Sequence, residues 1–235
     1  FMPYFYGFDY YYIVLVLPCI FFAMWAQFKV NSTFKKYSAV RSRRGLTGSQ
    51  AAEAVLRAAG VYNVRVERVA GHLTDHYDPR TNVIRLSDSV YSSTSVASIG
   101  VAAHEAGHAV QYARNYAPIK LCAAIIPITN IGSTLAMPLI LIGLVFSFGG
   151  LITLGIIFFA FATLFQLITL PVELDASRRA LAAIENGGLL YEDEHKMAKK
   201  TLWAAAMTYV AALAVSLAQL LRLILLFGGR GNRDD

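Results

Sequence analysis

The stretch LITLGIIFFAFATLFQLITL-PVELDASRRA occupies residues 151–180, and its character changes abruptly at Pro171. Residues 151–170 carry no charge and are long enough to cross about 30 Å of hydrocarbon as a helix. The ten residues that follow contain two acidic and two basic side chains. Because proline is favoured in the first turn of a helix, we expect a new helix to start at Pro171, just outside the membrane.

Three further segments are long and apolar enough to span a bilayer, at about residues 10–28, 121–146 and 203–227. Hydrophobic residues make up 56% of the chain and charged residues only 15%, whereas a soluble domain has about 25% charged residues. Cys19 and Cys122 lie inside apolar segments and are expected to be small buried hydrophobes. Arg222, near the end of the last segment, is expected to snorkel to the headgroups. The composition excludes a disordered chain and a disulfide scaffold, and predicts a mostly α-helical membrane protein with about four transmembrane helices.

The positions of the charges predict which side of the membrane each loop faces. Of the 21 basic residues, 13 lie between Lys29 and Lys120 and five more lie between residues 178 and 200. Basic residues beside apolar spans mark the cytoplasmic side and attract anionic lipids, so we expect the bilayer, and not a nucleic acid, to be the partner of this charge. Residues 147–150 are uncharged and the charges of the C-terminal tail sum to zero, so both chain ends are expected to face outward.

This pattern predicts five parts. They are an N-terminal transmembrane anchor (1–30), a cytoplasmic α+β domain (31–118), a transmembrane hairpin (119–170), a cytoplasmic helical segment (171–202) and a C-terminal transmembrane helix with its tail (203–235). In the cytoplasmic domain, a capping box at Thr47–Gln50 predicts a helix that ends before Gly60. Strands are expected at residues 61–69 and 83–86, followed by a helix over about 96–114.

The last of these helices contains His104-Glu105-Ala106-Gly107-His108, an HExxH pattern. Residues four apart lie one above the other on a helix, so both imidazoles can bind one ion. Glu105 is placed beside them to take a proton from the attacking water. Zn²⁺ accepts imidazole ligands and activates water near neutral pH, so we predict a hydrolytic zinc site. The simpler alternative is two helix histidines that only make hydrogen bonds.

A catalytic zinc needs a third protein ligand, and two carboxylates follow the third span. Glu173 and Asp175 lie about 200° apart on a helix, so only one of them can face the metal. The face of Glu173 continues through Ala176 and Ser177, which makes a smooth surface for close packing. Asp175 has arginines three and four residues later that can pair with it. We favour Glu173 as the ligand and keep Asp175 as the alternative.

HEAGH, GHLTDHYDP (residues 71–79) and VELDASRRA (residues 172–180) resemble the YugP-type membrane zinc metallopeptidases. The resemblance implies a neutral zinc peptidase of the gluzincin kind with a zincin-like domain, in a multi-pass protein of the bacterial cell membrane. It implies that His104, His108 and Glu173 bind zinc and that Glu105 is the general base. Many gluzincins have Asp four residues after the ligand Glu, where this chain has Ser177. Either Asp175 supplies that supporting carboxylate or the ligand assignment is shifted.

Other candidate residues lie in the cytoplasmic domain. His72 and His76 could form a second metal site if their segment were helical, but the flanking glycine and proline argue against a helix. His76 or Tyr77 could stabilise an oxyanion, although a surface or structural role is the simpler interpretation. Tyr112 could donate to a substrate carbonyl, although packing is the simpler role for it. The strand at residues 83–86 is either an edge that binds an extended peptide or a core strand.

Three classes of function remain open from the sequence. The first is a membrane-anchored zinc endopeptidase that cleaves peptides or membrane-proximal protein segments at the cytoplasmic membrane surface. The second is an intramembrane zinc protease whose HExxH helix lies in the bilayer. The third is a non-enzymatic zinc-binding scaffold or a transporter, but a scaffold has no need of a glutamate between the histidines, and few polar residues line the spans.

Overall fold

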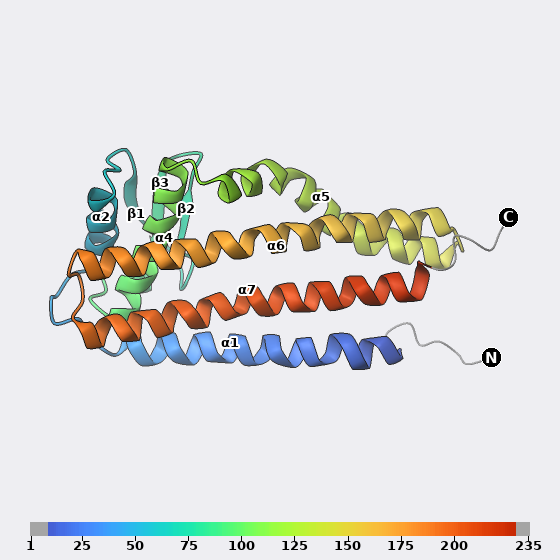
Figure 1. Cartoon of the computed structure of the whole chain (residues 1–235), viewed down its shortest axis with the longest axis horizontal. Helices are drawn as coiled ribbons and strands as arrows, with labels where there is room; N and C mark the ends of the chain where they lie inside the picture. Colours follow the sequence, from blue (N-terminus) through green and yellow to red (C-terminus); the bar gives the residue numbers. More distant parts are fainter. Residues whose placement is uncertain (1–8, 229–235) are drawn as a thin grey trace. The chain divides into compact units, whose positions relative to one another are not determined.

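The computed structural model describes residues 9–228, so the C-terminal tail used above to orient the chain lies outside the described residues. The described chain is mostly helical and contains one small mixed sheet (Figure 1). Its elements are η1 (Tyr12–Val16), α1 (Leu17–Ser38), α2 (Gly48–Ala58), β1 (Arg65–Val69), β2 (His76–Asp78), β3 (Val83–Ser87), α3 (Asp88–Tyr91), α4 (Val96–Ala113), α5 (Ala117–Val145), α6 (Gly149–Asn186) and α7 (Glu192–Phe227).

Four helical segments are long and apolar enough to cross a membrane: Tyr12–Ser38, Ala117–Val145, Gly149–Asn186 and Glu192–Phe227. This confirms the four apolar helices expected from the sequence. The expected helix start at Pro171 is wrong, because Pro171 lies inside α6. A proline inside a helix removes one backbone hydrogen bond and crowds the carbonyl four residues earlier, which can kink a helix without ending it. The third span and the segment that carries Glu173 are therefore one uninterrupted helix.

The chain divides into two compact units. The first contains residues 1–26, 121–170 and 208–235, and the second contains residues 27–120 and 171–207. Among the described residues of the first unit, Asp9 and Arg222 are the charged side chains, and they form an ion pair in which Arg222 Nε donates to Asp9 Oδ2 over 2.8 Å. Arg222 is 7% exposed, and a carboxylate near the start of η1 neutralises its charge within the protein. That Arg222 snorkels to the headgroups stays a prediction.

The second unit contains the helix and strands predicted between the first two spans. The capping box of α2 is present, with Thr47 accepting from Gln50 N and Gln50 Oε1 accepting from Thr47 N. The chain leaves α2 through Gly60, whose φ of +71° favours glycine. β1 is shorter than expected and begins at Arg65, because residues 61–64 turn from α2 towards the sheet.

The sheet has the order β1-β3-β2, with β1 parallel and β2 antiparallel to β3. The strand predicted at residues 83–86 is therefore the central strand, and its suggested role as a substrate-binding edge is wrong. Both sides of β3 are already hydrogen-bonded, and Val83, Ile84 and Leu86 are fully buried. Strand β2 was not predicted, because three residues between turns give too little alternation to be recognised.

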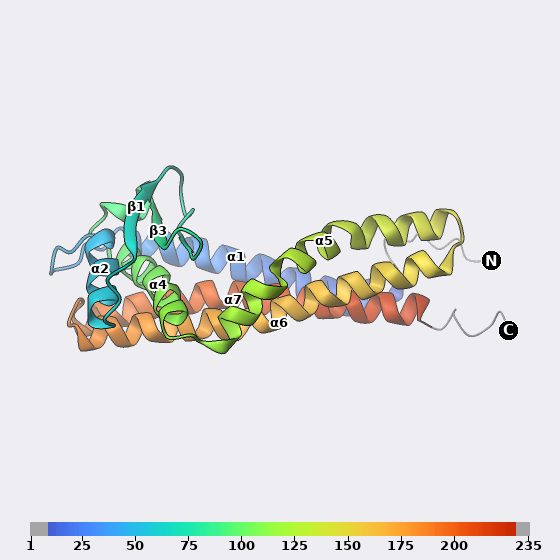
Figure 2. The ribbon, with the colours of Figure 1, turned by 90° about the horizontal axis from the view of Figure 1, so that it is seen from above.

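The core of the second unit forms around α4 (Figure 2), which packs against α2. This packing is close because the buried side chains of α4 are small. They include Ala97, Ala102, Ala103 and Ala106, all with 0% exposure. A helix with small side chains, buried on most of its surface, can pack closely against several neighbours at once. This packing holds α4 in a fixed position within the second unit.

Candidate metal centre

His104, His108 and Glu173 come together from α4 and α6, and all three belong to the second unit. Each offers one ligand atom, and these atoms lie within 4.8 Å of one another. Glu173 Oε2 is 3.2 Å from His104 Nε2 and 3.5 Å from His108 Nε2. The described structure therefore assembles the set of residues favoured from the sequence into a group that could hold a metal ion.

The donor set and its dimensions fit zinc. A tetrahedral ion with ligand distances near 2.0–2.1 Å places neighbouring ligand atoms about 3.3 Å apart. The two observed nitrogen–oxygen separations lie on either side of that value. The side chains of His104, His108 and Glu173 retain 15%, 14% and 15% exposure, so water can still reach the group. Two imidazoles and one carboxylate with a side open to water match the ligands of a catalytic zinc.

The far nitrogen of each imidazole has its own partner. His104 Nδ1 is 3.1 Å from Ser177 Oγ, and His108 Nδ1 is 3.1 Å from Gln111 Oε1. With a metal ion bound, a proton on each Nδ1 would satisfy these bonds and leave the Nε2 lone pair of each ring for the ion. Hydrogen bonds of this kind fix the tautomer and the ring orientation of metal ligands.

Gln111 connects His108 to Asp175. Its Nε2 donates to Asp175 Oδ2 over 2.9 Å and to the backbone oxygen of Val172 over 2.8 Å, and the Gln111 side chain is fully buried. Asp175 also pairs with Arg178 and accepts from Arg179 Nε at 2.5 Å. Asp175 is thus 4% exposed and fully engaged away from the metal group, which supports the choice of Glu173 over Asp175.

The structure also accounts for the serine at residue 177. Ser177 holds His104, while Asp175 holds His108 through Gln111, so the two supporting contacts are divided between neighbouring positions of α6. The sequence alone did not identify Gln111 as a functional residue. Its spacing of three residues from His108 on the same helix face was the signal that could have identified it.

Burial and charge set the protonation of the site. Burial raises the pKa of Glu105, while the neighbouring His104 and His108 oppose that shift. Burial alone would lower the pKa of His108, but the hydrogen bond to Glu173 and the Glu105 charge raise it to about 9. A carboxyl group with a raised pKa is a better proton acceptor near neutral pH, which suits a general base. A metal ion that binds His108 must displace a proton from it.

Gly107 lets α4 and α6 approach closely enough for this group to form. A Cβ atom at Gly107 would lie 2.6 Å from the backbone oxygen of Ala176, so no side chain fits there. Ala176 is itself fully buried, as expected for the smooth face of α6. The glycine inside HEAGH therefore has a structural role in bringing the Glu173 helix against the histidine helix.

The remaining candidates are not members of the metal group. His76 is on β2 and its Nδ1 is 2.9 Å from the backbone oxygen of Thr74, and His72 makes an edge contact with Phe34. The segment that carries both histidines is not helical, so the paired site they could have formed is absent from the described chain. Tyr112 packs against Tyr77 with ring centres 5.5 Å apart. Among the described residues, neither His72 nor His76 belongs to a group of three possible metal ligands. The roles suggested for His76, Tyr77 and Tyr112 towards a substrate stay predictions.

Comparisons with known proteins agree with this chemistry. Residues 12–228 match the family described as "Putative neutral zinc metallopeptidase". The chain is also 46% identical over 224 residues to the "Putative membrane protease YugP" of Bacillus subtilis (strain 168), an alignment that covers 95% of this chain and 99% of that protein. No solved structure matches the chain significantly.

Proposed function

The chain belongs to the putative neutral zinc metallopeptidase family, and on that basis we propose that it is a membrane-anchored zinc endopeptidase of the gluzincin kind. The observation that carries the proposal is the convergence of His104, His108 and Glu173 beside the buried carboxyl of Glu105. In this proposal the second unit is a zincin-like domain, and the three converging side chains bind one Zn²⁺.

The chain's own residues supply the proton transfers and the positioning. A zinc ion in this site would acidify a water molecule and polarise the carbonyl of the scissile bond. Glu105 accepts the proton from the attacking water and later donates it to the leaving amine nitrogen. Gln111 and Ser177 hold the imidazoles in one orientation, so little reorganisation is needed when charge develops.

We place the site at the cytoplasmic membrane surface. In the described chain α4 is not one of the four helices that are apolar enough to span a membrane, which favours a surface site over an intramembrane one. Glu173 follows the uncharged run of residues 151–170 by only three positions, so along α6 it lies close to the end of that run. Eighteen of the 21 basic residues fall in the second unit, as the positive-inside rule requires of a cytoplasmic part. Substrates would be unfolded proteins or membrane-proximal segments.

The activity test uses the purified full chain and a quenched fluorescent casein at neutral pH. Glu105→Gln should keep zinc bound and abolish cleavage, because it removes the base and leaves the ligands. His104→Ala should lose both zinc and cleavage. Glu185→Gln, which changes an exposed carboxylate of α6, serves as the control and should behave like the unmodified protein. Cleavage that survives Glu105→Gln would exclude this mechanism, and zinc without any cleavage in the unmodified protein would favour a scaffold.

The orientation test uses single cysteines in a Cys19→Ala/Cys122→Ala background. Tyr62 in the second unit is 81% exposed, and Phe148 between α5 and α6 is 58% exposed. In intact cells a membrane-impermeant maleimide should label Phe148→Cys but should label Tyr62→Cys only after permeabilisation. The opposite pattern would place the site outside the cell.

A further inference from the structure

A pocket in the second unit is lined by residues of α1 and α7 and has a volume of about 710 Å³. We call it the basic pocket, because five of its nine lining residues are lysines and none is acidic. Its lining residues are Lys29, Ser32, Thr33, Lys36, Tyr37, Lys196, Lys199, Lys200 and Trp203. None of them belongs to the candidate metal centre.

Both helices present the same spacing to the basic pocket. On α1 the lining residues Lys29, Ser32, Thr33 and Lys36 stand at positions i, i+3, i+4 and i+7, and on α7 residues 196, 199, 200 and 203 repeat that spacing. Side chains with this spacing share one helix face. The pocket is therefore formed by two basic faces turned towards one another.

The electrostatics of the basic pocket call for an anion. Lys196 pairs with Glu192 at 2.7 Å, whereas the charges of the other four lysines are not offset by any carboxylate among the lining residues. Like charges that face one another repel, and a bound anion relieves that repulsion. The Thr33 hydroxyl adds a donor of the kind that binds phosphate oxygens, and Thr33 is 9% exposed, so it lies in the wall of the pocket. The Ser32 hydroxyl already donates to the backbone oxygen of Lys29 over 3.1 Å.

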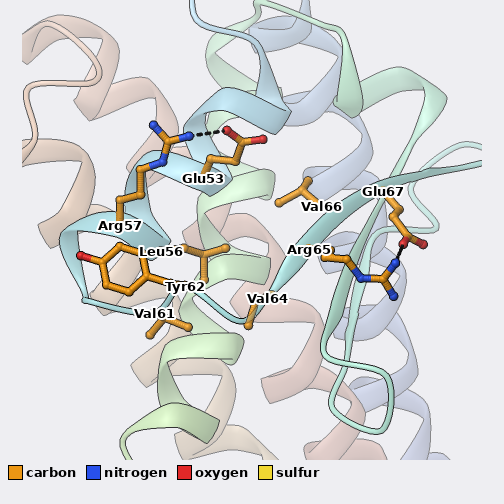
Figure 3. A pocket seen from close by; sticks show the side chains of 9 residues that line it. All are labelled: Glu53, Leu56, Arg57, Val61, Tyr62, Val64, Arg65, Val66 and Glu67. Carbon is orange, nitrogen blue, oxygen red and sulfur yellow. Dashed lines mark hydrogen bonds and ion pairs between the residues drawn. The ribbon is translucent and has the colours of Figure 1, made fainter.

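A second pocket in the same unit differs from the basic pocket in that its basic side chains are paired with carboxylates. It lies between α2 and β1 and has a volume of about 490 Å³ (Figure 3). Its two arginines are already paired, Arg57 with Glu53 at 3.1 Å and Arg65 with Glu67 at 2.9 Å. Its charges balance within the protein, so a bound anion would not be favoured there as it is in the basic pocket.

The basic pocket lies where each helix changes from polar to apolar sequence. Lys29 follows the apolar run of α1, and Trp203 begins the apolar run of α7. Tryptophan and tyrosine are favoured at the level of lipid headgroups, and Trp203 is 52% exposed while Tyr37 lies in the pocket wall. Basic pockets between transmembrane helices on the cytoplasmic side suit phosphorylated lipid headgroups. We propose that the basic pocket binds the phosphate of an anionic membrane phospholipid.

This site stands independently of the proposed peptidase activity. The lysines lie on α1 and α7, whereas the metal group lies on α4 and α6, so a variant of the pocket should keep its zinc. The test uses the purified full chain in neutral detergent micelles doped with phosphatidylglycerol or phosphatidylcholine. Native mass spectrometry counts the bound lipid, and zinc analysis of the same sample reports on folding.

Phosphatidylglycerol should bind more tightly than phosphatidylcholine. Lys29→Gln/Lys199→Gln should weaken phosphatidylglycerol binding about 25-fold, since one lysine near an anionic surface contributes about fivefold. The control Lys35→Gln/Lys120→Gln removes two exposed lysines that do not line the pocket, and it should change binding by less than about twofold. Zinc content should stay unchanged in both variants.

Three results would overturn the proposal. Equal binding of the two lipids would mean that headgroup charge is not recognised. An equal loss in the two double variants would reduce the effect to net charge. Displacement of phosphatidylglycerol by millimolar inorganic phosphate would assign the basic pocket to a free phosphate instead of a lipid.

Discussion

Replacing Gly107 with alanine tests the packing that brings the Glu173 helix against the histidine helix. The added Cβ atom would lie 2.6 Å from the backbone oxygen of Ala176, and backbone on both helices leaves no flexible atom to yield. Gly100 provides a matched control on the same helix. A Cβ atom there would lie 3.5 Å from the Cβ atom of Ala198, which is an ordinary contact.

The two substitutions should differ in their effect on the free energy of unfolding. Alanine is favoured over glycine inside a helix by about 1 kcal/mol, so Gly100→Ala should stabilise the protein by up to that amount. Gly107→Ala gains the same propensity but adds an overpacking cost of about 1–3 kcal/mol, so it should be neutral to destabilising. It must also move α4 and α6 apart by at least about 0.4 Å, the difference between 2.6 Å and the 3.0 Å that such a contact requires. Zinc ligand distances tolerate about 0.2 Å, so zinc affinity should fall about 10–100-fold.

Zinc affinity is measured by competition with a chromogenic chelator, and stability by thermal unfolding of the full chain in detergent. Gly107→Ala should lose affinity while Gly100→Ala keeps it and unfolds at a slightly higher temperature. If Gly107→Ala bound zinc as tightly as the unmodified protein, the close approach of α4 and α6 would not be what positions the ligand, and this reasoning would be refuted.

Three further predictions concern the partners of the ligands, pH and the first unit. Gln111→Leu removes the acceptor for His108 Nδ1, so zinc affinity should fall about 10–100-fold in the same chelator assay, with unchanged affinity counting against the orienting role. The pKa of His108 is raised to about 9, so its contribution to the stability of the metal-free protein is complete below pH about 6.5 and is lost as the pH rises through about 9. Zinc binding at pH 7 should release about one proton from this site, which calorimetry in buffers of different ionisation enthalpy would measure; no release would contradict the raised pKa. Asp9→Asn leaves Arg222 without its carboxylate and should destabilise the protein by roughly 3 kcal/mol while zinc per protein stays constant, because Asp9 and the metal group lie in different units.

Local chemistry was sufficient to predict most of the elements. Each apolar run is long enough to predict a membrane-spanning helix by itself. The capping box at Thr47 and the glycine at residue 60 mark the two ends of α2. HExxH likewise needs only one turn of helix to align its histidines. The local signal failed where neighbours outside the segment decided the outcome. Helix α6 continues through Pro171, and the three-residue strand β2 forms because it pairs with β3.

The sequence by itself determined an apolar chain with four long helices, an HExxH helix and two candidate carboxylates just beyond the third span. Only the tertiary structure brings Glu173, and not Asp175, to the histidines, because Glu173 is 69 residues from His104 and the distance between them depends on how closely α4 and α6 pack. The structure also assigned Ser177 and Gln111 to the far sides of the imidazoles. Periodicity within a helix specifies which side chains share a face, but the partner of that face is selected by packing between segments distant in the chain.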